Sequence, residues 1–147
     1  MIKNKPILLT LVLIAVAFIW IQSALPAGAS NNESEWFKTH IVEPVYEFIT
    51  GKPAGDDLDV RKPAHVAEYF VFAALLSLSI TSDSSLRNIA VPVLLSFFAA
   101  FIDESIQIFS GRGSSIKDVW IDFTGAFFGI LTVRLIKCIL SKSNRER

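Results

Sequence analysis

Four long apolar runs dominate this sequence of 147 residues, and short charged segments separate them. The runs cover approximately residues 6–25, 63–81, 88–109 and 116–138. A helix of about 20 apolar residues is long enough to cross the hydrocarbon core of a bilayer. Hydrophobic residues make up 52% of the chain and charged residues only 19%, which leaves little polar surface for a soluble domain. We therefore predict an all-α integral membrane protein, a single domain over residues 1–147 with four transmembrane helices.

The first two runs need separate consideration. Lys3 and Lys5, the apolar run that follows them and the small residues 27–29 have the order of a cleavable signal peptide. The run is at the long end for such a peptide, so we expect it to be retained as a span. The second run is the shortest of the four, and crossing the membrane would require it to tilt or to use its flanking residues.

The charged residues between the runs are distributed unequally, although the formal net charge is zero. Residues 26–62 contain seven acidic and four basic side chains, whereas residues 134–147 contain five basic side chains and one acidic. Cytoplasmic segments of membrane proteins concentrate Lys and Arg. We therefore predict that both termini are cytoplasmic and that segments 26–62 and 109–115 lie outside. Four basic residues run against this rule: Arg61, Lys62, Arg112 and Lys117.

The first outer segment contains an amphipathic pattern over residues 35–50. Its apolar residues recur at helical spacing with acidic residues between them: Phe37, Ile41, Val45, Phe48 and Ile49. This pattern predicts an amphipathic helix that lies at the membrane surface. Pro44 is expected to kink this helix or divide it in two, because proline cannot donate a backbone hydrogen bond.

Polar residues gather at one end of the last three runs. In the predicted topology His65 and Glu68 begin the second span, whereas three polar residues end the third and two begin the fourth. This set of candidate pocket residues comprises His65, Glu68, Asp103, Glu104, Gln107, Arg112, Asp118 and Asp122. All of them fall near the outer face, and those three or four positions apart share one face of their helix. Ionisable groups at membrane depth are costly, so we expect these side chains to face one another or a water-filled pocket.

Two features of this set leave alternatives open. Glu104 points about 100° away from Asp103 around the helix, so only one of the two needs to face inward. Acidic residues also outnumber basic ones, so either some carboxyls hold protons or a cationic group enters from outside. A single histidine with scattered carboxylates has no recognisable metal-ligand spacing. We therefore predict no metal site and no cofactor.

The third and fourth runs suggest how the helices are joined and packed. Ser115 and Asp118 have the spacing of a capping box, with Asp in place of the usual Glu. Gly125 and Gly129 lie four residues apart, a spacing that allows close approach of two membrane helices. We expect these glycines to pack against another helix of the same chain.

These residues resemble the VanZ-like family of four-span bacterial membrane proteins, named after a teicoplanin resistance determinant. The similar segments are RKPAHVAEY at 61–69, DESIQIFSGRGSSIKD at 103–118 and DFTGAFFG at 122–129. SALP at 23–26 resembles the family's exit from its first helix, which implies that the first span is retained. The family commonly has Asn where this sequence has Asp122, which implies an additional negative charge in this pocket. The resemblance implies location in the bacterial cell membrane and, for some members, a link to glycopeptide resistance.

Three functions are compatible with the polar set. The first is binding or remodelling of an outer-leaflet or cell-wall-related ligand, such as an envelope precursor, a lipid or a glycopeptide. The second is a membrane hydrolase in which Glu68 or Asp103 acts as general base and His65 as acid or orienting group, although no serine or cysteine nucleophile is recognisable. The third is a structural clamp that holds the helices together. Whether the protein is an enzyme, and its oligomeric state, stay open. The lipid bilayer is an expected partner and nucleic acid is not.

Overall fold

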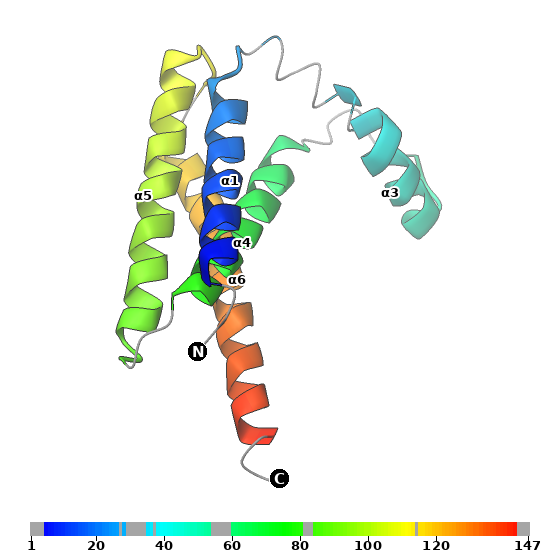
Figure 1. Ribbon diagram of the computed structural model, residues 1–147. Coiled ribbons are helices and arrows are strands. Elements are labelled where there is room, and N and C mark those ends of the chain that lie inside the picture. The colour runs from blue at the N-terminus through cyan, green and yellow to red at the C-terminus, as the bar shows by residue number, and fades with distance from the viewer. Residues whose placement is uncertain are drawn as a thin grey trace.

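The computed structural model describes residues 5–26, 28, 35–36, 38–53, 60–80, 84–113 and 115–143, and within these ranges it contains helices but no strand. The elements are α1 (Lys5–Ala24), the π-helical turn η1 (Lys38–Val42), α3 (Glu43–Thr50), α4 (Arg61–Ser79), α5 (Arg87–Phe109) and α6 (Ile116–Ser143). Figure 1 shows α1, α4, α5 and α6 gathered into a bundle. The predicted all-α class is therefore confirmed for the described residues.

Three of the helices, α1, α5 and α6, are long and apolar enough to cross a membrane. Apolar side chains cover their outer surfaces, as expected for helices that face lipid: Leu13 on α1, Phe98 on α5 and Leu135 on α6 are all more than half exposed. The apolar run predicted at 63–81 forms α4, which is not among the three candidate spans found in the described residues. The protein thus has the character of a membrane protein, while a membrane span at α4 stays a prediction.

Helix α4 occupies the interior of the bundle and contacts α1, α5 and α6. Its buried residues Tyr69, Phe72, Ala73 and Leu76 form the centre of the apolar core. Around them pack Ile19 of α1, Ala99 and Ala100 of α5, and Ala126 and Ile130 of α6. Small residues at these contacts let the helix backbones approach closely.

Helices α4 and α6 pack in close contact, because glycines of α6 face the backbone of α4. A Cβ atom on Gly125 would overlap the carbonyl oxygen of Val66, and one on Gly129 would overlap that of Phe70. The two helices can therefore lie this close only where α6 has no side chain. This contact places the beginning of α4 beside the beginning of α6, where the polar residues lie.

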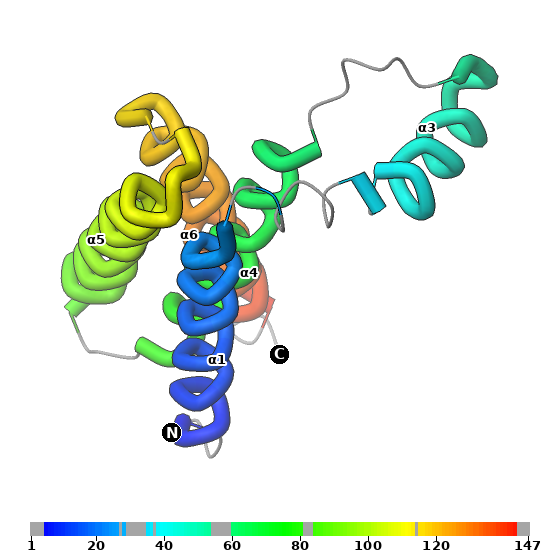
Figure 2. The backbone as a smooth tube through the Cα atoms, turned by 90° about the horizontal axis from the view of Figure 1, so that it is seen from above, coloured from blue at the N-terminus to red at the C-terminus, as the bar shows by residue number. Residues whose placement is uncertain are grey.

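The segment between α1 and α4 contains two consecutive elements at 38–50 instead of one helix over 35–50. The π-helical turn η1 leads directly into α3, which has Pro44 in its first turn, where a missing N–H costs no hydrogen bond. Figures 1 and 2 show these elements at one side of the bundle. No residue of α3 is buried, and Phe48 and Ile49 are largely exposed. Phe37 lies outside the described residues, and an amphipathic helix at the membrane surface stays a prediction.

Candidate functional site

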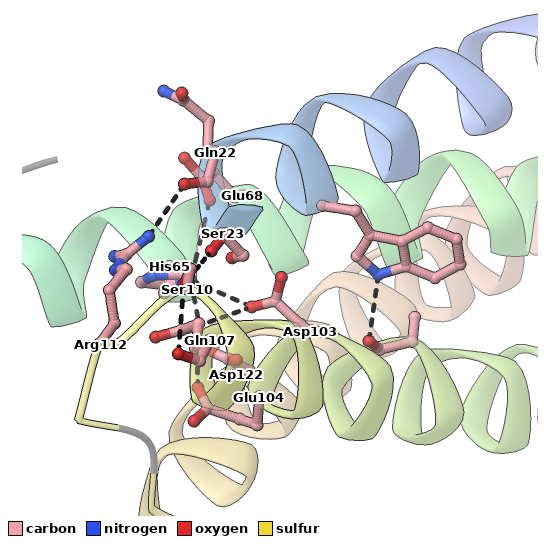
Figure 3. Close-up of polar contacts among 12 residues, drawn as sticks. Gln22, Ser23, His65, Glu68, Asp103, Glu104, Gln107, Ser110, Arg112 and Asp122 are labelled. Carbon is pink, nitrogen blue, oxygen red and sulfur yellow. Dashed lines mark hydrogen bonds and ion pairs between the residues drawn. The ribbon is translucent and has the colours of Figure 1, made fainter. Parts of the chain in front are cut away.

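A pocket of about 370 Å³ opens between α4, α5, α6 and the link between α5 and α6. Its lining residues are Arg61, Lys62, His65, Glu104, Gln107, Gly113, Asp118, Ile121 and Asp122. The lining therefore contains five of the eight candidate residues predicted from the sequence. The other three candidates, Glu68, Asp103 and Arg112, lie beside the pocket, and Figure 3 shows them grouped with His65 and Asp122.

His65 is at the centre of the acidic residues from three helices. Its Nδ1 atom lies 3.9 Å from Oε2 of Glu68, 3.8 Å from Oδ2 of Asp103 and 3.7 Å from Oδ1 of Asp122. Each distance is longer than a normal hydrogen bond, which for such atoms ends near about 3.2 Å. The imidazole therefore lies almost equally far from three carboxyls and is hydrogen-bonded to none of them.

The two acidic residues of α5 are both buried. Gln107 donates from Nε2 to Oδ2 of Asp103 at 3.2 Å and to Oε1 of Glu104 at 3.1 Å. The backbone N–H of Ser115 donates to Oε2 of Glu104 at 3.3 Å. Asp103 is fully buried and Glu104 is 5% exposed, so both face inward even though only one needed to do so. Glu104 can turn inward because Gln107 and Ser115 supply its hydrogen bonds.

Arg112 fastens the α5–α6 link to the end of α1. Its guanidinium donates from Nη1 to the carbonyl oxygen of Gln22 at 2.9 Å, and Ser110 donates from Oγ to the carbonyl oxygen of Ser23 at 2.8 Å. Both carbonyls belong to the last turn of α1, where backbone oxygens have no partner within the helix. Burial lowers the pKa of Arg112 from its usual value, and the nearby charge of Arg61 lowers this pKa further.

Gln22, Ser23 and Ser110 were missed by sequence reasoning. Gln22 contributes through its backbone oxygen, which any residue could provide, whereas Ser23 contributes a backbone oxygen and also a fully buried hydroxyl. In the sequence, Arg112 between two glycines was the only indication that the α5–α6 link is held to another part of the bundle.

Helix α6 begins differently from the predicted capping box. Oγ of Ser115 accepts a hydrogen bond from the backbone N–H of Lys117 at 3.1 Å. The backbone N–H of Ser115 donates to Oε2 of Glu104 and not to the side chain of Asp118. Asp118 is consequently available to the pocket, which it lines as a half-buried side chain. Lys117, one of the four basic residues that run against the charge rule, is exposed.

Several buried polar atoms near the pocket have no hydrogen-bond partner among the described residues. They include His65 Nδ1, Tyr69 Oη, Asp103 Oδ1 and Asp122 Oδ2. A buried polar group left without a partner costs about 1–3 kcal/mol, and more when it is charged. Such groups are rare in folded proteins and require a specific explanation. The arrangement is suited to receiving a ligand group that supplies the missing interactions.

Three of these residues could also hold a cation. One ligand atom from each of His65, Asp103 and Asp122 lies within 4.8 Å of the other two. Two of the three side chains are carboxylates with almost no exposure to solvent, since Asp103 is fully buried and Asp122 is 2% exposed.

Comparison with known proteins places the whole site within the range matched by one family model. A family model described as VanZ/LLP1 matches residues 8–137, a range that includes all eight candidate pocket residues and both glycines of α6. No curated protein and no solved structure matches the chain.

Proposed function

The chain belongs to the VanZ/LLP1 family, and from that premise we propose that it binds an outer-leaflet or cell-wall-related ligand of the bacterial envelope. The binding site in this proposal is the pocket between α4, α5 and α6. Its ligand is an envelope precursor, a lipid or a glycopeptide, and binding it is the step through which such a protein would contribute to teicoplanin resistance.

The observation that carries this proposal is the set of unpaired buried polar atoms beside an open pocket. A structural clamp stabilises a bundle by pairing its polar groups, and a half-satisfied network is worse for stability than apolar packing. Nδ1 of His65 and Oδ2 of Asp122 lack partners among the described residues, although both side chains line the pocket. This pattern favours a site that awaits a ligand over a clamp.

The charges of the pocket suggest the chemistry of that ligand. The lining contains Arg61 and Lys62 at the start of α4, and the acidic residues Glu104 of α5 and Asp118 and Asp122 of α6. A ligand that carries both phosphate and amino or hydroxyl groups would complement both kinds of charge. Lipid-linked precursors of the cell wall have this combination, so we take this class as the ligand to be tested first.

The proposal includes a membrane arrangement with four spans and both termini in the cytoplasm. In this arrangement α4 is the second of the four spans, and its first turns tolerate His65 and Glu68 because these residues face the polar set. The opposite end of α6 is basic: Lys137 donates to the carbonyl oxygen of Ser77 at 2.9 Å, and Arg134 donates to Ser85. Basic residues at that end favour the cytoplasmic side. The pocket then opens outward, and α3 rests its apolar side chains on the outer membrane surface.

Binding of defined ligands to the purified protein in lipid nanodiscs tests this function. Lipid-linked cell-wall precursors, bacterial phospholipids and teicoplanin are compared for the wild type, Arg61→Gln and Lys62→Gln, with Lys142→Gln as a control at the opposite end of α6. We expect roughly tenfold weaker binding for each pocket variant, which corresponds to about 1.4 kcal/mol, and unchanged binding for the control. Equal binding by all four proteins, or binding of none of these ligands by the wild type, would refute the proposal.

A further inference from the structure

We propose that His65, Asp103 and Asp122 together bind one divalent transition-metal ion, of the zinc or manganese type, at the inner end of the pocket. This inference deepens the proposed function and rests on the same pocket, since it identifies an inorganic group that would contact the envelope ligand. It revises the sequence-based prediction of no metal site, because the three residues come from three helices and have no common motif.

The distances between the side chains fit metal ligands better than hydrogen-bond partners. Nδ1 of His65 is 3.8 Å from Oδ2 of Asp103 and 3.7 Å from Oδ1 of Asp122. Ligand atoms bound at about 2.0–2.1 Å to a tetrahedral ion are roughly 3.3–3.4 Å apart. The three ligand atoms lie within 4.8 Å of one another, so the side chains would have to draw closer around an ion, and each carboxylate offers two oxygens for this. All three side chains point toward one another in Figure 3.

Burial provides a second and independent reason. Asp103 is fully buried and Asp122 is 2% exposed, and each has one carboxylate oxygen without a hydrogen-bond partner in the described part of the chain. Their ion pairs recorded among the described residues are with His65, and Nη1 of Arg112 donates to the carbonyl oxygen of Gln22. Two buried carboxylates without a cation are strongly unfavourable. A divalent cation would compensate the negative charges of both carboxylates, and Nδ1 of His65 would coordinate it.

The ligand types select the class of ion. Imidazole is suited to zinc, iron and related transition metals, whereas sites made only of oxygen favour magnesium or calcium. One nitrogen with two carboxylates therefore favours zinc or manganese. Gln107 donates to Oδ2 of Asp103 and would orient it, the role that hydrogen-bonded outer residues have in metal sites. With three protein ligands the ion keeps an open position, and the lining by His65 and Asp122 directs that position toward the pocket.

Metal binding by the full-length protein in detergent tests the proposal directly. The protein is stripped with a chelator, titrated with Zn²⁺, Mn²⁺ or Co²⁺ and desalted, and bound metal is measured by elemental mass spectrometry. We expect one ion per chain, and for Co²⁺ visible absorption bands that report nitrogen and oxygen ligands. His65→Gln and Asp122→Asn should each weaken binding by more than the 10–100-fold that loss of an outer residue typically causes. Glu47→Gln, which removes one carboxylate from an exposed position of α3 away from the pocket, should leave it unaltered.

Each result bears on the proposal. Failure of the wild type to bind one ion per chain would overturn it, as would binding that survives Asp122→Asn, because the ion would then lie elsewhere. Since Asp122→Asn preserves side-chain shape, its melting temperature shows whether loss of metal reflects loss of fold. The two proposals separate when envelope ligands are tested on chelated protein. Ligand binding without any metal site would refute only the metal inference, whereas metal binding without any envelope ligand would refute only the proposed function.

Discussion

Gly125 of α6 lies directly against the backbone carbonyl oxygen of Val66 in α4, so that a Cβ atom at Gly125 would overlap that oxygen. The same relationship recurs one turn later, between Gly129 and Phe70. Since Val66 follows His65 and Gly125 is three residues after Asp122, this contact sets the distance between His65 and Asp122. The spacing of two glycines thus determines the geometry of the candidate site.

Replacing either glycine by alanine should force α4 and α6 apart. The obstructing atoms belong to the backbone and cannot rotate away, so we expect Gly125→Ala and Gly129→Ala to lower the free energy of unfolding by about 1–3 kcal/mol, as overpacking does. Thermal unfolding in detergent measures the loss. Gly113→Ala is the control, because a Cβ there would meet nothing within 4 Å. Equal melting temperatures for the three variants would show that the helices are not in this close contact.

Gly111 is expected to be sensitive for a different reason. Its φ angle is +72° and a Cβ would meet nothing within 4 Å, so the obstacle to a side chain is conformational and not spatial. Left-handed backbone costs non-glycine residues about 1–2 kcal/mol, and Asn tolerates it better than Ala. Gly111→Ala should therefore destabilise the protein more than Gly111→Asn, as measured by thermal unfolding. The reverse order would contradict the turn geometry that precedes Arg112.

The sequence predicted the helices better than it predicted how they are fastened together. The apolar runs at 88–109 and 116–138 correspond to α5 and to most of α6, because apolar length directly reflects a membrane helix. The end of α6 at Ser143 was not predicted, because a helix can continue into polar residues beyond the bilayer. The boundary between η1 and α3 lies between Val42 and Glu43, so that Pro44 falls in the first turn of α3.

The candidate site was predicted in part, since periodicity indicates the face of each helix but not the distance between helices. The spacing of polar residues along each helix identified His65 and Asp122 as candidates. The packing of α4 and α6 brings Nδ1 of His65 to 3.7 Å from Oδ1 of Asp122. Contacts from Ser110 and Arg112 to carbonyl oxygens of α1 could not be predicted, because backbone oxygens are present at every position. The burial of Glu104 could not be predicted for the same reason, because its side chain accepts a hydrogen bond from the backbone N–H of Ser115.

Removing the guanidinium of Arg112 should loosen the link between α5 and α6. Arg112 is 7% exposed and donates to the carbonyl of Gln22, and hydrogen bonds of charged groups contribute about 1.5–3 kcal/mol. We expect Arg112→Gln to lower the free energy of unfolding by a value in this range. Arg87→Gln, the same change at an exposed position, should have almost no effect. Chemical denaturation in mixed micelles measures both, and equal stabilities would mean that the link does not depend on this anchor.

The proposed topology predicts which positions are accessible from outside the cell. Cys138 is exposed, so it is first replaced by serine, and single cysteines are then introduced at positions 35, 57, 84 and 113. We expect an impermeant thiol reagent to label positions 35, 57 and 113 in intact cells, and position 84 only after lysis. Labelling of position 84 in intact cells would place the link between α4 and α5 outside, and the pocket could then not open outward.

Amide substitutions distinguish a binding site from a structural clamp. Glu68→Gln and Asp103→Asn keep the shape of the side chain but remove its negative charge, and both carboxyls lie within 3.9 Å of His65 Nδ1. Residues held in place for binding are often costly to stability. We therefore expect both variants to melt at the wild-type temperature or above it and to bind the envelope ligand more weakly.

Glu47→Gln is the matched control for this comparison, because Glu47 is an exposed residue of α3, away from the pocket. It should alter neither the melting temperature nor ligand binding. A clamp would behave in the opposite way, since the loss of a charged partner in a packed network lowers stability first. Variants of Glu68 and Asp103 that unfold at lower temperature, and lose binding only to the extent that they unfold, would therefore assign these residues to the scaffold and remove the reason for placing a ligand beside His65.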